Sequence, residues 1–208
     1  MSVAETDRKI RWPGDPAGLT TEVVDFEALA HVLGNTCCWG GRTLKFYSLA
    51  QHAVTVCSAA QALGGLDETD GKSLALHALL ADAWRAWLPE PAGGDGPAKA
   101  LEKHARERDA VLRTVLEAAG APAELPASWN QALELTRRMA DAALVRDLAG
   151  AGVDLGASRG GPLFPPLKER IRPMRPEIAA RRWLDALHAA APPAADGSGL
   201  AQAPGGGT

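Results

Sequence analysis

Residues 74–88 read LALHALLADAWRAWL, and this stretch decides the fold. Leucine and alanine occupy nearly every face of its first three helical turns. A helix that is apolar all round is buried inside a bundle, whereas a surface helix keeps one polar face. The stretch therefore predicts a core helix running from about Ser73 to Leu88.

The composition of the 208 residues agrees with packed helices. Hydrophobic residues make up 46% and aromatic residues only 5%, and few windows are rich in β-branched residues, which argues against a β-sandwich or barrel. N-cap residues, and apolar residues that repeat about every 3.6 positions, predict an all-α bundle of five or six helices. The predicted helices cover residues 26–33, 49–63, 73–88, 97–119, 128–148 and 176–190.

This pattern predicts a single domain with two flanking segments. Residues 1–24 are expected to form an extended N-terminal arm, and residues 25–190 the helical domain. Residues 150–175 are rich in glycine and proline, so they are expected to be irregular. Residues 191–208 contain mainly alanine, proline and glycine and are expected to be a disordered tail.

The net charge, the lack of long apolar runs and the cysteines exclude some classes of function and indicate a location. The formal net charge of −3 gives no basic surface for a nucleic-acid polymer. No apolar run approaches the ~18 residues that a membrane span needs, and the N-terminus shows no secretory signal. Three cysteines without a CxxC motif indicate a reduced protein, so we expect a cytoplasmic location.

Two polar residues stand out in apolar surroundings. Asp82 lies deep in the core stretch, where a carboxylate must be paired, hydrogen-bonded or bound to a metal. Arg85 lies three positions later and offers a salt bridge. His52, in LAQHAVTVC, is either a packed core histidine or a ligand. The Cys37-Cys38 pair gives only a weak signal of redox or nucleophilic chemistry.

Several segments together resemble a known family. The segments are WGGRTLKFYSLAQHAVTV (residues 39–56), LALHALLADAW (74–84) and IRPMRPEIAARRWLDAL (171–187). In this order they resemble the HD superfamily of metal-dependent phosphohydrolases, in the branch of bacterial 5′-deoxynucleotidases and their phage-type relatives. The resemblance covers about residues 23–188 and implies an HD-domain-like helical fold.

The resemblance implies a divalent metal ion as cofactor, among Mn, Co, Mg, Ni or Zn. In the family a His, an adjacent His-Asp pair and a later Asp hold the ion, which binds phosphate and activates water. His52 matches the first ligand and Asp82 the Asp of the pair, but Ala81 replaces its His. Arg85 replaces the usual catalytic Glu. Glu90 matches a further carboxylate, so Asp82 and Glu90 are the implied catalytic residues.

The last ligand has two alternatives. Asp141 matches an Ala-Asp pair typical of that helix, whereas an alignment anchored on residues 146–148 places Arg137 there. The preferred metal set is therefore His52, Asp82 and Asp141.

The same resemblance implies where a substrate would bind. Trp39 matches an aromatic residue near the nucleobase, and its alternative is a packed loop residue. Arg42 and Lys45, in the same loop, are candidate phosphate contacts. Arg85 is a further candidate because a guanidinium group binds phosphate well.

Two functions are compatible with the family residues that this sequence keeps and those that it replaces. The first is a phosphohydrolase-like protein that acts on or binds (deoxy)nucleotide phosphates through a reduced metal site. The alternative is a catalytically inactive HD-fold protein that binds a nucleotide or a protein partner. The expected ligand is a nucleotide or small phosphate ester, and a homodimer is left open because some relatives dimerise.

Overall fold

The computed structural model describes residues 16–63, 66–88, 98–149 and 164–192. Most of the expected arm, most of the expected tail and Glu90 lie outside the described residues. Of the expected arm, residues 16–24 contain two short 3-10 turns, Pro16–Gly18 (η1) and Thr21–Val23 (η2).

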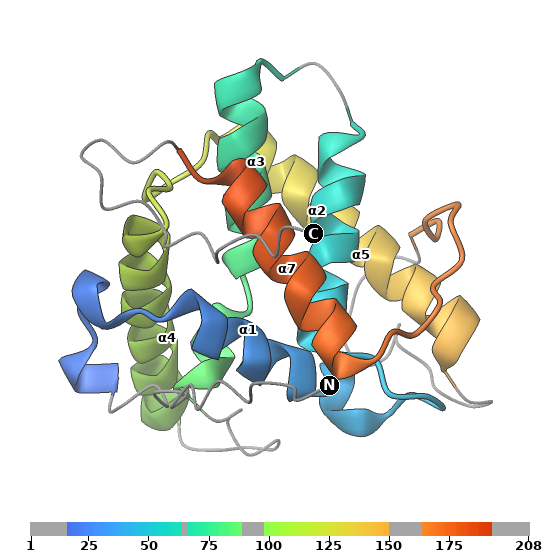
Figure 1. The fold of residues 1–208 in the computed structure, drawn as a ribbon, viewed down its shortest axis with the longest axis horizontal. Helices are drawn as coiled ribbons and strands as arrows, with labels where there is room; N and C mark the ends of the chain where they lie inside the picture. Colours follow the sequence, from blue (N-terminus) through green and yellow to red (C-terminus); the bar gives the residue numbers. More distant parts are fainter. Residues whose placement is uncertain (1–15, 64–65, 89–97, 150–163, 193–208) are drawn as a thin grey trace, which may run out of the picture.

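The protein is an all-α single domain (Figure 1). Over the described ranges it has six α-helices and no β-strand, with two isolated bridges, Cys37 to Ser48 and Thr43 to Ala149. The prediction of a helical bundle is confirmed. The helices are α1 (Phe26–Asn35), α2 (Leu49–Gln61), α3 (Glu68–Leu80), α4 (Ala98–Ala118), α5 (Ala127–Leu148) and α7 (Pro176–Ala190).

Side-chain caps fix where three of the helices begin. Asp25 accepts a hydrogen bond from the backbone N–H of Ala28, and Ser48 accepts one from Gln51, as the sequence predicts for α1 and α2. Asp67 does the same for α3 through Asp70. Such caps satisfy backbone donors that the first helical turn leaves unpaired.

The predicted helix over 73–88 is wrong at both ends. Because Asp67 caps the chain six residues earlier than expected, the polar residues 68–72 form the first turns of α3. At the other end α3 stops at Leu80, and Asp82 has φ −105° and ψ 8° before a 3-10 turn, Ala83–Ala86 (η4). An Asp side chain with partners outside the helix favours such a break.

The core lies where α2, α3 and α7 meet. The leucines of α3, at positions 74, 76, 79 and 80, are buried as predicted. Helix α2 packs against α3, α5 and α7, and α7 packs across α1 in the front of Figure 1. Trp183 of α7 is fully buried, and its indole N–H donates to the carbonyl of Leu79 at 3.0 Å. Among the described residues, no helix is both long and apolar enough to cross a membrane.

Candidate functional site

Asp82 lies between two arginines. Its Oδ1 accepts a hydrogen bond from Nε of Arg85 at 3.0 Å, and its Oδ2 accepts one from an Nη of Arg137 at 3.1 Å. Only 14% of the Asp82 side chain is exposed. The salt bridge to Arg85 was one of the sequence alternatives for Asp82, whereas Arg137 of α5 was predicted only as an alternative for the last ligand position.

The charges around Asp82 decide its protonation. Burial by itself raises the pKa of Asp82, but the positive charges of Arg137 and Arg85, with a contribution from His52, outweigh burial and hold this pKa below its usual range. Asp82 is therefore ionised at neutral pH, and its charge is balanced by two cations from different parts of the chain.

His52 and Asp141 form a second group beside this one. Nε2 of His52, on α2, lies 3.8 Å from Oδ1 of Asp141, on α5. Both side chains are largely buried, at 7% and 12% exposure. The indole N–H of Trp39 donates to the same Asp141 oxygen at 3.3 Å. Trp39 is thus a packed loop residue that also touches the polar group.

The two groups belong to one site. His52 acts electrostatically on Asp82, and both Asp82 and Asp141 act on the buried thiol of Cys38. Burial, followed by the charges of Asp82 and Asp141, raises the pKa of Cys38 to about 12. A thiol with such a pKa stays protonated, so Cys38 is not a nucleophile.

The loop that carries Trp39 has an unusual backbone. Trp39, Gly40 and Gly41 have φ of 57°, 59° and 80°. Trp39 is the one non-glycine residue with positive φ in the described ranges. The left-handed region is unfavourable for residues with a Cβ, and such residues cluster at functional sites. The loop is held by hydrogen bonds from Cys38 to Tyr47 and from Leu44 to Leu148.

Arg85 also stacks on the tryptophan beside it. Its guanidinium carbon lies 4.6 Å from the ring centroid of Trp84, and Trp84 in turn contacts His104 of α4 edge to face. A guanidinium group that stacks on an indole ring loses little freedom when it binds an anion. Arg85 is therefore pre-positioned by Trp84, whose ring contacts α4.

The remaining predicted residues fall into three groups: two reach the site, two are exposed on the loop after Trp39, and one lies outside the described residues. Arg137 and Asp141, the two alternatives for the last ligand, both reach the site, since Arg137 binds Asp82 and Asp141 lies beside His52. Arg42 and Lys45 have exposed side chains on the loop after Trp39. Glu90 lies outside the described residues.

The arrangement does not fit the divalent ion that the resemblance implies. No group of three or more His, Cys, Asp or Glu side chains in the described ranges is arranged to hold a metal. Both oxygens of Asp82 already bind guanidinium groups. An ion there would lie beside two fixed positive charges, which repel it. Ala81 adds no donor atom.

Comparison with known proteins adds no assignment: no model of a protein family matches the chain, and no curated protein matches it. The interpretation of the site therefore rests on its geometry. Four segments far apart in sequence bring two carboxylates, an imidazole, two guanidinium groups and an indole to one place. Such a cluster can bind an anion that is partly aromatic, through its cations and its tryptophans.

Proposed function

We propose that this protein is an HD-like domain that binds the phosphate of a nucleotide, or a small phosphate ester, directly through arginine. The ion pairs on both oxygens of Asp82 carry the proposal. They supply two positive charges at the place where the resemblance implies a divalent cation. The protein is then a binding module rather than an ordinary metal-dependent phosphohydrolase.

The exposure of the arginines supports this role. Side-chain exposure is 25% for Arg85 and 31% for Arg137, so solvent reaches both. A guanidinium group has five N–H donors in a planar fork. The ion pair of Arg137 with Asp82 uses one nitrogen of that fork. A phosphate that approaches from solvent can therefore be bound without displacement of Asp82, and we infer that the base of a nucleotide would stack on Trp39.

A second candidate is hydrolysis through a reduced metal site. The observation that favours it is the close approach of His52 to Asp141, which leaves one imidazole and one carboxylate side by side. Two protein ligands are fewer than the three found in catalytic zinc sites. The titration described next distinguishes hydrolysis from binding alone.

The test is calorimetric titration of the purified protein with dAMP and with inorganic phosphate, first in EDTA and then in Mn²⁺. We expect dAMP to bind in EDTA with an affinity that Mn²⁺ leaves unchanged. We also expect that no inorganic phosphate is released from dAMP in either condition. Arg137→Lys keeps the charge but loses the fork, so dAMP affinity should fall by roughly tenfold or more. Arg138→Lys changes the neighbouring arginine of α5, which pairs with Glu134, and is the matched control.

Two results contradict the proposal. If neither dAMP nor phosphate binds in EDTA, the proposal that the arginines bind phosphate without a metal is wrong. Phosphate release that requires Mn²⁺ and is abolished by His52→Ala would favour the second candidate.

A further inference from the structure

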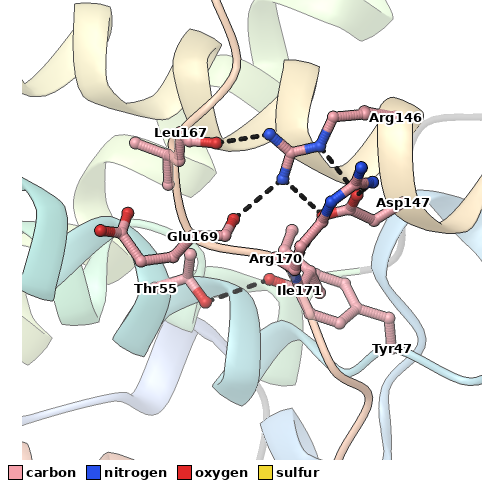
Figure 2. Close-up of polar contacts among 8 residues, drawn as sticks. All are labelled: Tyr47, Thr55, Arg146, Asp147, Leu167, Glu169, Arg170 and Ile171. Atoms are coloured by element: carbon pink, nitrogen blue, oxygen red, sulfur yellow. Dashed lines mark hydrogen bonds and ion pairs between the residues drawn. The ribbon is translucent and has the colours of Figure 1, made fainter.

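Residues 164–175, which we call the strap, lead into α7 (Figure 1) and make polar contacts with the end of α5 (Figure 2). The backbone N–H of Leu167 donates to the carbonyl of Met139 at 3.3 Å. Arg146 of α5 donates to the carbonyls of Leu167 and Glu169 at 2.6 and 2.9 Å. One arginine thus binds the strap backbone at two points.

Asp147 binds the strap next to Arg146. Its carboxylate accepts hydrogen bonds from the Arg146 guanidinium, from Arg170 at 2.6 Å and from the backbone N–H of Ile171 at 2.8 Å. Only 4% of the Asp147 side chain is exposed. The hydrogen bonds from Arg146, Ile171 and Arg170 outweigh burial and lower the pKa of Asp147 well below its usual range.

Gln51 of α2 binds the next part of the strap. Its side-chain nitrogen donates to the carbonyl of Arg172 at 2.8 Å, and its side-chain oxygen accepts from the N–H of Met174 at 2.9 Å. Gln51 belongs to α2 and is buried. Both ends of its amide are thus used on the strap backbone, so the strap connects α5 to α2.

Two of these anchors are close to site residues along their helices. Gln51 precedes His52 on α2, and Met139 lies two positions before Asp141 on α5. At 3.8 Å the His52 and Asp141 side chains are too far apart for a direct hydrogen bond. Their separation is therefore set by the placement of α2 against α5, which the strap ties together.

We propose that Gln51 and Asp147 are positioning residues, which hold the strap so that His52 of α2 lies against Asp141 of α5. This positioning role rests on the proposed function only in that the site it holds is the proposed phosphate-binding site. The geometry itself is testable without any ligand, because the Trp39 indole N–H bonds to Asp141 and reports where that carboxylate lies.

The experiment records the indole N–H signals of ¹⁵N-labelled protein by NMR. The chain has six tryptophans, and Trp39→Phe identifies the Trp39 signal by its loss. Trp183→Phe identifies the signal of Trp183, which bonds to Leu79 in the core and serves as an internal control. We expect Gln51→Ala and Asp147→Ala to shift or broaden the Trp39 signal and to leave the Trp183 signal in place.

Asn130→Ala is the matched control variant. It removes a hydrogen bond from α5 to Leu125 that involves no strap residue, and should leave the Trp39 signal unchanged. If Asp147→Ala fails to fold, Gln51→Met decides the question, because it keeps the side-chain length and removes both hydrogen bonds to the strap. In folded variants of Gln51 and Asp147 we also expect dAMP affinity to fall by roughly tenfold.

An unchanged Trp39 signal in folded Gln51→Ala, Gln51→Met and Asp147→Ala proteins would overturn the positioning role. The outcome is independent of the proposed function. If the protein binds no nucleotide but the variants shift the Trp39 signal, the proposed function is wrong and the positioning role stands. If the protein binds dAMP but the variants leave the Trp39 signal unchanged, the proposed function stands and the positioning role is wrong.

Discussion

At Asp82 one carboxylate is balanced by two guanidinium groups, and the balance explains why a charge is tolerated in an apolar bundle. Removing one partner of a buried ion pair leaves an uncompensated charge and costs several kcal/mol. Arg85 was visible from its spacing of three residues. Arg137 lies 55 residues from Asp82 along the chain, so no local pattern could reveal that contact.

Backbone conformation at single glycines gives a first stability prediction. Gly41 has φ of 80°, where a Cβ is unfavourable, whereas Gly71 lies inside α3 with open space around its Cα. Gly41→Ala should lower the free energy of unfolding by about 1–2 kcal/mol. Gly71→Ala should raise it by about 0.5–1 kcal/mol, because alanine is the better helix former.

Urea denaturation of the two variants beside the parent protein measures the difference. The variants are matched, since each adds one methyl group to a site with no heavy atom within 4 Å. Equal effects of both substitutions would show that the left-handed turn after Trp39 is not present in solution.

At the scale of elements, the bundle depends on a close crossing of α1 and α7. A Cβ at Gly34 would lie 2.8 Å from the carbonyl oxygen of Pro176 and 3.0 Å from Cβ of Ala180. The first neighbour is backbone and cannot rotate away. Gly34 was predicted to close the first helix as a terminal residue, but here it lets two helices approach.

Gly34→Ala should therefore destabilise the protein by about 1–3 kcal/mol through overpacking. The expected result is a lower midpoint in thermal unfolding, followed by far-UV circular dichroism. Gly18→Ala is the control, because nothing lies within 4 Å of that position. A midpoint for Gly34→Ala equal to that of the control would mean that α7 does not cross α1 this closely.

The elements also show what local patterns determine. Helices α5 and α7 begin and end within one residue of their predicted limits, because apolar spacing and, for α7, the proline in its first turn are local signals. The break at Asp82 was missed, since the apolar run continues through it and the partners that favour the break lie elsewhere. The strap was expected only to be irregular. Most of the hydrogen bonds that anchor it are made to strap backbone groups, which have no sequence signature.

At the scale of the whole molecule, two carboxylates with lowered pKa predict the response to acid. The pKa values of Asp82 and Asp147 lie below the ordinary 3.8. As the pH falls below about 4–5, the unfolded chain takes up protons that the folded protein does not. The free energy of unfolding should therefore be highest above this window and fall as the pH approaches the folded pKa values.

Asp147→Asn removes one of these groups and should flatten the dependence between pH 5 and pH 3. At pH 7 it should cost about 2 kcal/mol, since charge-assisted hydrogen bonds are lost. Chemical denaturation at several pH values measures both quantities. Asp185→Asn, at an exposed carboxylate on α7, is the control, and identical slopes for the two variants would contradict the prediction.

The site as a whole was only partly predictable. His52, Asp82, Asp141 and Trp39 were all selected from the sequence, and the structure brings them together. Of the partners of Asp82, only Arg85 was predicted, because whether a carboxylate meets a further cation or a metal depends on residues that approach from other helices. Arg137, proposed only as an alternative position, is the clearest case.

The double ion pair at Asp82 has a consequence for any attempt to build a metal site at this place. Because one carboxylate is shared by two guanidinium groups, replacing Asp82 alone leaves both arginines without it, whereas replacing one arginine leaves a neutral pair. Introducing histidine at position 81 would therefore not be enough to bind a divalent ion, since the two arginines would still lie where that ion must enter.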